Sequence, residues 1–255
     1  MTATPAGITY ADYLKLDQLL TAQQPLSGLH DEMLFIIIHQ TKELWMKQML
    51  HELELAIPLV GEDSFAAAYK ALARISRIQS VMTLSWEVLS TLTPVDYLAF
   101  RHVLGTSSGF QSAQFREFEF RLGLKDSAYL QYHAEGGEDR RRLESALERP
   151  SLRDACLSAL ERAGFDLGDR SVAAIAAAWL EVYRDSQRWF DLYQLAEKLV
   201  DLDDAMAAWR HKHVLTVERI IGNKTGTGGS AGASYLRSTL DKRIFPELWA
   251  LRTDL

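Results

Sequence analysis

The stretch from His30 to Ile57 contains neither proline nor glycine, so nothing local interrupts a helix there. Asp31 is placed to act as its N-cap or first-turn acid. The apolar run at residues 33–38 directly precedes His39, so this part of the helix is apolar on almost every side and should be deeply buried. Phe35 lies one turn before His39 and is its neighbour. A buried imidazole needs a partner, which is either a backbone carbonyl or a bound ligand.

Helical periodicity continues along the rest of the chain, and no stretch alternates as a strand would. We therefore predict one all-α domain over residues 1–255, with its functional site between long helices. A short helix near Tyr10 is too short to be stable alone and must dock on something, either its own chain or another subunit. The remaining helices are expected at residues 64–92, 94–104, 114–123, 136–149, 151–165, 173–200 and 206–221, and after residue 233 with a break at Pro246.

Composition excludes several classes of protein. Apolar residues make up 47% of the chain, which allows a sizeable core. The net charge of −6 argues against a non-specific nucleic-acid binder, which would carry a basic face. The one cysteine, Cys156, lies in a polar helical stretch with no evident chemical role and fits a reducing compartment. The N-terminal residues lack a signal-peptide pattern and no apolar run has the length of a membrane span, so we expect a soluble, cytoplasmic protein.

The stretch from Met206 to Gly232 is a helix that ends in a glycine-rich loop. At helical spacing, His213 falls on an apolar stripe with Met206 and Trp209, whereas His211 falls on the opposite side. The imidazole presented to the interior is therefore that of His213. A buried neutral imidazole is a good ligand for iron, including haem iron. The alternative is a core histidine that is hydrogen-bonded to a carbonyl.

Two further features of the sequence offer groups that could bind a ligand. Arg101 lies at an apolar helical seam, where it needs a carboxylate from a ligand or from a salt bridge. The small-residue turn at 105–110 leaves backbone N–H groups available. The glycine cluster at 222–232 lacks the order of a phosphate-binding loop and follows no strand. We interpret it as flexible backbone that packs close to a ligand and orders around it.

Three long motifs resemble one known family. They are HDEMLFIIIHQTKELW (30–45), TPVDYLAFRHVLGTSSGFQS (93–112) and WRHKHVLTVERIIGNKTGTGGSAG (209–232). Together they closely resemble the tryptophan 2,3-dioxygenases, in their bacterial form. The resemblance implies an all-α, homotetrameric enzyme that uses ferrous haem b. Such an enzyme inserts both atoms of O2 across the indole C2–C3 bond of L-tryptophan and yields N-formyl-L-kynurenine, the first step of tryptophan degradation by the kynurenine route.

The resemblance also implies roles for individual residues. His213 matches the axial ligand of the haem iron in the family motif W-R-x-x-H, and His211 departs from the usual motif. His39 matches the distal histidine that accepts a hydrogen bond from the indole N–H. Arg101 matches the arginine that pairs with the substrate carboxylate, and Thr227 the threonine that binds the substrate ammonium and carboxylate. The wall of the distal pocket is matched by Phe35, Tyr97, Trp86, Leu104, Ser108 and Gly109. The N-terminal segment 1–20 is expected to close a neighbouring subunit's site with Tyr10, Tyr13 and Leu14.

Other readings use the same residues. A haem-based sensor could bind haem and tryptophan without turnover, although a gas sensor has no use for a carboxylate clamp. A purely structural bundle would keep His39 and His213 as core residues and would be colourless. A di-iron bundle is disfavoured because the Glu-x-x-His pairs that it needs are missing from facing core helices. Within the enzyme reading, we expect His39 to position the indole, because the indole N–H is too weak an acid for an imidazole to deprotonate.

Overall fold

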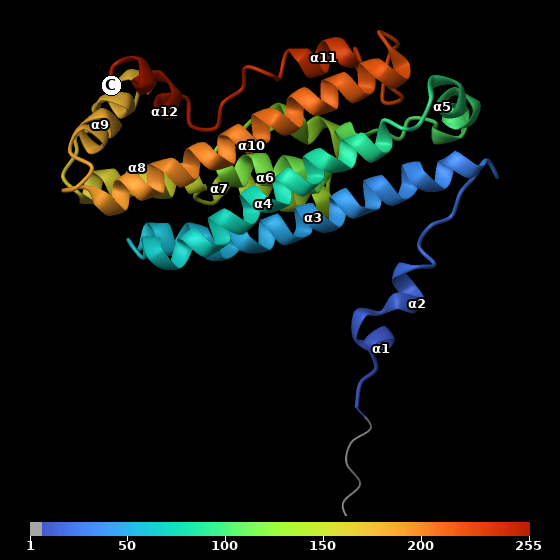
Figure 1. The fold of residues 1–255 in the computed structure, drawn as a ribbon, viewed down its shortest axis with the longest axis horizontal. Helices are drawn as coiled ribbons and strands as arrows, with labels where there is room; N and C mark the ends of the chain where they lie inside the picture. Colours follow the sequence, from blue (N-terminus) through green and yellow to red (C-terminus); the bar gives the residue numbers. More distant parts are fainter. Residues whose placement is uncertain (1–6) are drawn as a thin grey trace, which may run out of the picture.

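A computed structural model describes residues 7–255; the first six residues of the predicted N-terminal segment 1–20 lie outside the described part. Every regular element in residues 7–255 is a helix, which confirms the all-α prediction (Figure 1). None of the helices in this range combines the length and the apolarity needed to cross a membrane.

Three long helices form the frame of the molecule. Helices α3 (His30–Gly61) and α4 (Phe65–Leu89) form an antiparallel hairpin, and α10 (Phe190–Ile221) lies along α4 (Figure 1). Helix α3 continues through Pro58, beyond the proline-free stretch, and the backbone N–H of Glu62 caps it by donating to the Pro58 carbonyl. The N-terminal end of α3 therefore meets the C-terminal ends of α4 and α10 at one end of the bundle.

The remaining elements are short. They are α1 (Tyr10–Leu14), α2 (Leu16–Leu19), α5 (Pro94–Phe100), η1 (Arg101–Leu104), η2 (Gly109–Gln111), α6 (Ala113–Leu122), η3 (Ser127–Tyr132), α7 (Glu138–Glu148), α8 (Leu152–Arg162), α9 (Val172–Arg184), α11 (Ala233–Arg237), α12 (Pro246–Ala250) and η4 (Leu251–Thr253). The helix predicted over 94–104 thus divides into α5 and a tighter 3-10 turn, η1, so that Arg101 stands at the break.

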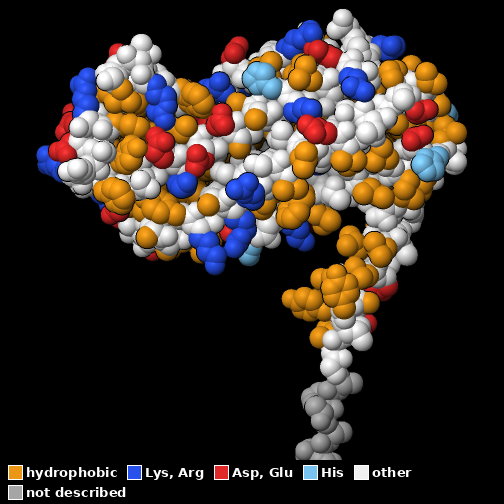
Figure 2. Space-filling view, in the orientation of Figure 1, with side chains coloured by type: hydrophobic (Ala, Val, Ile, Leu, Met, Phe, Trp, Pro, Cys, Tyr) orange, Lys and Arg blue, Asp and Glu red, His pale blue; other side chains and the backbone are white. Residues whose placement is uncertain are grey.

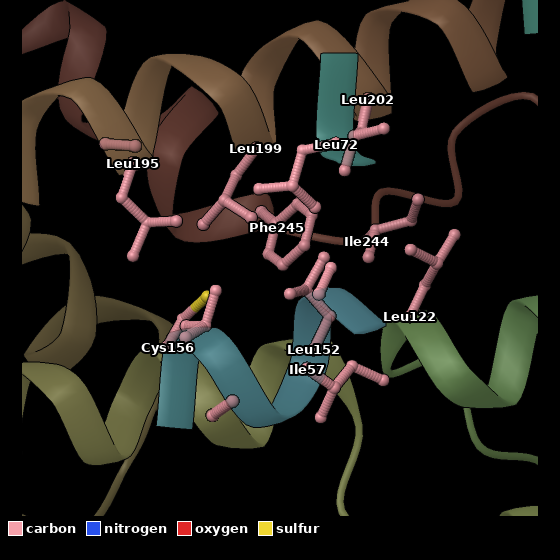
Figure 3. Packing of buried hydrophobic residues seen from close by; sticks show 14 of the residues in the cluster. Ile57, Leu72, Leu122, Leu152, Cys156, Leu195, Leu199, Leu202, Ile244 and Phe245 are labelled. Carbon is pink, nitrogen blue, oxygen red and sulfur yellow. The ribbon is translucent and has the colours of Figure 1, made fainter. Parts of the chain in front are cut away.

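The main core fills the bundle away from that end. Leucines of α4, α8 and α10 interdigitate with Ile244 and Phe245 of the C-terminal segment (Figure 3). Cys156 lies among them and is buried, so the prediction that it sits in a polar helix is wrong: α8 turns its apolar face, including this thiol, into the core. Burial raises the pKa of the Cys156 thiol, which keeps it protonated and unreactive.

The C-terminal segment contains less helix than the sequence predicts. A helix was expected from residue 233 to the break at Pro246, but α11 ends at Arg237. Asp203 of α10 is fully buried and accepts hydrogen bonds from the backbone N–H groups of Ile244 and Phe245 and from the Trp249 indole N–H. This carboxylate satisfies the backbone donors just before α12 and so anchors that part of the chain to α10.

Charged residues also hold helices together. The Glu119 carboxylate of α6 is buried between Arg116 and Arg210, at 2.9 Å from the latter, and so ties α6 to α10 three residues before His213. Arg149, the C-cap residue of α7, pairs with Glu54 of α3 at 2.7 Å, and both side chains are about half exposed.

The N-terminal segment projects away from the bundle (Figure 1). Its apolar side chains are exposed and gather on the projecting arm (Figure 2). Tyr10 is 75% and Tyr13 72% exposed, so in this chain α1 and α2 bury nothing of their own. Such a segment is completed only by contact with another surface.

Candidate functional site

A second apolar cluster occupies the end of the bundle where α3 begins and α10 ends. It joins α3, α4, α5 and α10 through Ile38, Trp86, Leu89, Leu92, Tyr97, Phe100 and Ile220. Phe35 and Leu104 pack against it. The predicted wall residues Phe35, Trp86, Tyr97 and Leu104 therefore come together, with the Phe35 and Tyr97 ring centroids 5.8 Å apart.

His39 lies in this cluster in a fixed orientation. Its Nδ1–H donates to the Phe35 carbonyl one turn earlier at 2.7 Å, and its ring lies 4.2 Å from the Phe35 ring. This bond places the proton on Nδ1 and leaves Nε2 as an acceptor. Burial lowers the pKa of His39 to about 4, with a further lowering from the charge of Lys42. His39 is therefore a neutral acceptor near pH 7.

His213 faces the same site from α10. Its ring is stacked on the Trp86 indole, with centroids 4.3 Å apart and planes 9° apart, and lies 5.2 Å from the Trp209 ring. Burial lowers its pKa to about 3, and the charges of Lys42 and His39 lower it further. Both imidazoles lie close enough to Lys42 for its charge to lower their pKa, so they belong to one site. His211 is exposed and donates to the Ala207 carbonyl at 2.9 Å, so it faces away, as the helical spacing predicts.

The glycine-rich loop 222–232 closes over the turn at 105–109. Arg101 donates to the Thr225 carbonyl, and the Thr227 hydroxyl donates to the Ser107 carbonyl. No carboxylate in residues 7–255 forms an ion pair with Arg101, so the intramolecular salt bridge weighed for it is not formed there. The Arg101 guanidinium and the Thr227 hydroxyl thus each donate to a backbone carbonyl. A substrate carboxylate can replace these carbonyls as the acceptor, because a charged acceptor binds more strongly.

Glycine is needed where this loop touches the turn. A Cβ on Gly228 would lie 2.6 Å from the Ser108 Cβ, so the close approach of these two segments requires that Gly228 carry no side chain. Ser108 and Gly109 open η2, where the Ser108 hydroxyl accepts from the Phe110 N–H. The structure therefore brings Arg101, Ser108, Gly109 and Thr227 to one edge of the aromatic cluster.

The predicted N-terminal contributors are not part of this arrangement within one chain. Tyr10, Tyr13 and Leu14 lie on α1, in the projecting arm, and all three are exposed (Figure 1). A contribution from them would have to come from a neighbouring copy.

The sequence analysis missed Lys42. This residue is only 5% exposed, and its Nζ lies 2.7 Å from the centroid of the Trp86 ring. It is three residues after His39, on the same face of α3. Its helical spacing from Ile38, Met46 and Met49, which places a lysine on an apolar face, is the signal that could have identified it.

The residues present fit a haem. His213 supplies a neutral nitrogen ligand, and flat aromatic side chains suit the faces of a macrocycle. Within residues 7–255, the Nζ of Lys42 and the Nε1 atoms of Trp86 and Trp209 are buried without a hydrogen-bond partner, as expected beside a large polar-edged group. In the same range, no group of three or more His, Cys, Asp or Glu side chains is arranged to hold a metal ion.

An open groove lies elsewhere, on the outer face of the α3–α4 hairpin. It has a volume of about 660 Å³ and is lined mainly by Leu44, Trp45, Arg74, Arg77 and Val81. None of the predicted site residues lines it. The chemistry of the aromatic cluster, with its two neutral imidazoles, makes that cluster the better candidate for a functional site.

Comparison with known proteins identifies the family of the chain. The family model of tryptophan 2,3-dioxygenase matches residues 1–169 and 167–255. The chain belongs to the tryptophan 2,3-dioxygenase family. A tryptophan 2,3-dioxygenase of Caulobacter vibrioides is 60% identical, over 97% of this chain and 98% of that protein. Tryptophan 2,3-dioxygenases of a Polaromonas species and of Bacillus thuringiensis are 52% and 51% identical, over 88% and 93% of their lengths. The resemblance seen in three sequence motifs thus extends over nearly the whole chain.

Proposed function

We propose that this chain is a haem-dependent dioxygenase that inserts both atoms of O2 across the C2–C3 bond of the L-tryptophan indole and releases N-formyl-L-kynurenine. The observation that supports it most is the pair of neutral imidazoles, His39 on α3 and His213 on α10, in one aromatic cluster whose edge carries Arg101 and Thr227. The reaction itself is the one for which the family is named.

His213 would hold the haem iron, and the Trp86 stack would fix the rotation of its ring. The haem, when bound in its ferrous form, supplies O2 binding and the redox chemistry of the reaction. The aromatic walls would exclude water and hold the indole flat beside the iron. Phe35, Tyr97 and Leu104 would form this wall.

The polar groups would orient the substrate. The Nε2 atom of His39 would accept the indole N–H, because its Nδ1–H is already committed to the Phe35 carbonyl. Arg101 would leave the Thr225 carbonyl for the substrate carboxylate, and Thr227 would bind the substrate ammonium and carboxylate. Ser108 and Gly109 would lie beside this end of the substrate. One end of the slot is thus polar and the other apolar, which is what tryptophan requires.

A homotetramer would complete the site. The exposed apolar arm of α1 and α2 would pack on another copy, where Tyr10, Tyr13 and Leu14 would close the neighbour's pocket. The competing function is a sensor that binds haem and tryptophan without turnover; the Arg101 and Thr227 pair at the edge of the site favours the enzyme.

The test is the absorption spectrum of the purified protein after supply of haem and reduction, followed by L-tryptophan and air-saturated buffer. We expect a haem Soret band and a growing N-formylkynurenine absorbance. His213→Gly should lose the axial-ligand spectrum, whereas the matched control His211→Gly, two residues away and exposed, should keep it. A Soret band that shifts with tryptophan without product would indicate the sensor, and the absence of any haem band would refute both functions.

A further inference from the structure

Lys42 is the one basic side chain on the inner wall of the described part of this site that has no oxygen or nitrogen partner. Its Nζ is buried without an acceptor, and no carboxylate in residues 7–255 lies within ion-pair distance of it. The nearby Lys212 pairs with Glu87 at 3.1 Å, and Arg101 donates to a carbonyl. The three donors of the Lys42 ammonium are therefore unused.

A buried ammonium without an anion is costly. The face of the Trp86 ring offsets part of this cost by cation–π attraction. Burial lowers the pKa of Lys42 to about 6, so near pH 7 the amine is mostly neutral until an anion lies beside it and favours its charged form. The charge of Lys42 also lowers the pKa of both His39 and His213, so the amine belongs to the same site as the two imidazoles. A carboxylate brought into this site would satisfy the ammonium.

Two carboxylate-bearing molecules enter the site under the proposed function, the amino acid and the haem. Arg101, at the far edge of the cluster, suits the single carboxylate of tryptophan. Lys42 lies one turn deeper along α3 than His39, and a four-carbon stem carries its amine further. Its amine lies against the Trp86 indole, on which the His213 imidazole also stacks, so Lys42 adjoins the residues that would hold the haem, and haem carries carboxylates.

We propose that the Lys42 ammonium is the counter-charge for a carboxylate of the haem, which it binds after leaving the face of Trp86. This inference rests on the proposed haem site. It adds a cofactor-binding residue on α3, in contact with the Trp86 ring that stacks on His213. The long flexible stem lets the ammonium move without a change in the backbone.

The experiment compares haem with haem dimethyl ester, whose carboxylates are blocked. Each is supplied to the wild type, to Lys42→Met, which keeps the length of the stem without charge, and to Lys47→Met. Lys47 is the matched control because it lies on the same helix and is exposed. The measured quantity is the rate of cofactor transfer to excess apomyoglobin. We expect Lys42→Met to release haem about 10- to 100-fold faster than the wild type, the loss typical of a hydrogen bond to a charged group.

With the dimethyl ester, wild type and Lys42→Met should release the cofactor at the same rate, since no charge remains to be paired. Lys47→Met should match the wild type with both cofactors. Lys42→Arg keeps the charge and should stay within a few-fold of the wild type with haem. A lower haem reduction potential in Lys42→Met would agree, because removal of a nearby cation favours the ferric state.

Equal release of haem by wild type and Lys42→Met would overturn the inference and leave the haem site intact. Equally faster release of haem and of its dimethyl ester would also overturn it, because Lys42 would then act by packing. Unchanged haem release with weaker tryptophan binding would assign Lys42 to the substrate instead. A wild type that shows no Soret band would refute the proposed function itself, and this inference with it.

Discussion

The imidazole of His213 lies almost parallel to the indole of Trp86, with 4.3 Å between ring centroids and 9° between planes. Such stacking contributes on the order of 1 kcal/mol beyond burial, and here it also fixes the rotation of the imidazole about its own side chain. Trp86 comes from α4 and His213 from α10, so the orientation of the imidazole is set by the packing of two helices.

Acid should destabilise the haem-free protein over a pH range that is set by the pKa values of His39 and His213. His213 has a pKa of about 3 and His39 of about 4, whereas an unfolded histidine titrates near 6.5. The unfolded state therefore binds protons that the folded state does not, and the stability present above about pH 6.5 falls as the pH drops towards 4. Urea unfolding at about pH 7 and about pH 5.5 measures this loss, above the range where carboxylates titrate.

The matched variants for that measurement are His213→Leu and His211→Leu. The first should show a smaller loss of stability between the two pH values, and the second the same loss as the wild type, because His211 is exposed. An equal loss in both variants would show that His213 is not the buried neutral group described here.

Removal of the His39 imidazole should lower the activity of the enzyme without abolishing it. His39→Ala takes away one neutral hydrogen-bond acceptor, so we expect kcat/KM for tryptophan to fall roughly 10-fold. The measurement is kcat/KM of the haem-loaded wild type and variant, with tryptophan and with 1-methyltryptophan, a substrate that lacks the N–H. Complete loss of turnover with unchanged tryptophan affinity would mean that His39 acts as an essential base instead.

Arg101 should discriminate substrates by their carboxylate. Arg101→Gln removes a charged two-donor fork, so tryptophan affinity should fall about 10- to 100-fold. Tryptamine lacks the carboxylate and should bind the wild type and the variant equally. Titration of the haem spectrum with each ligand tests this. If the variant bound tryptophan and tryptamine with equally reduced affinity, Arg101 would support the structure of the loop and would not recognise the substrate carboxylate.

Gly228→Ala should disturb the loop and leave the bundle intact. The added Cβ would meet the Ser108 Cβ at 2.6 Å, so the loop must lift from the turn at 105–109. We expect weaker tryptophan binding with an unchanged thermal unfolding temperature. Gly61→Ala is the control, since an added Cβ there meets nothing within 4 Å. The double variant with Ser108→Gly removes the clash together with the Ser108 hydroxyl, so its reference is the Ser108→Gly single variant, and both should bind tryptophan equally. Weaker binding by the double variant would mean that another contact positions the loop.

The long helices could be predicted from local pattern alone. Residues 30–57 and 206–221 carry continuous helical periodicity without breakers, and both lie within the long helices α3 and α10. The single helix predicted over 173–200 is wrong, because α9 ends at Arg184 and α10 begins at Phe190. The same pattern placed His213 inward and His211 outward. Local signals decide these features because the helix period alone determines which side chains share a face.

Contacts between distant segments account for what the sequence analysis missed. Asp203 of α10 binds the backbone N–H groups of Ile244 and Phe245, about forty residues later in the chain, and no local pattern marks this contact. The pairing of Thr227 with the Ser107 carbonyl joins a loop to a turn and leaves no trace in either local pattern. Lys42 could have been identified, because a lysine facing the core is visible in the periodicity, but its partner could not.

The most direct test of the central claim is the fate of molecular oxygen. The haem-loaded wild type should be given L-tryptophan and a mixture of fully labelled and unlabelled O2, and the product analysed by mass spectrometry. The account predicts N-formylkynurenine molecules that carry either two labelled oxygen atoms or none, since both atoms come from one O2. A population of products that carry a single labelled atom, or the complete absence of doubly labelled product, would contradict it.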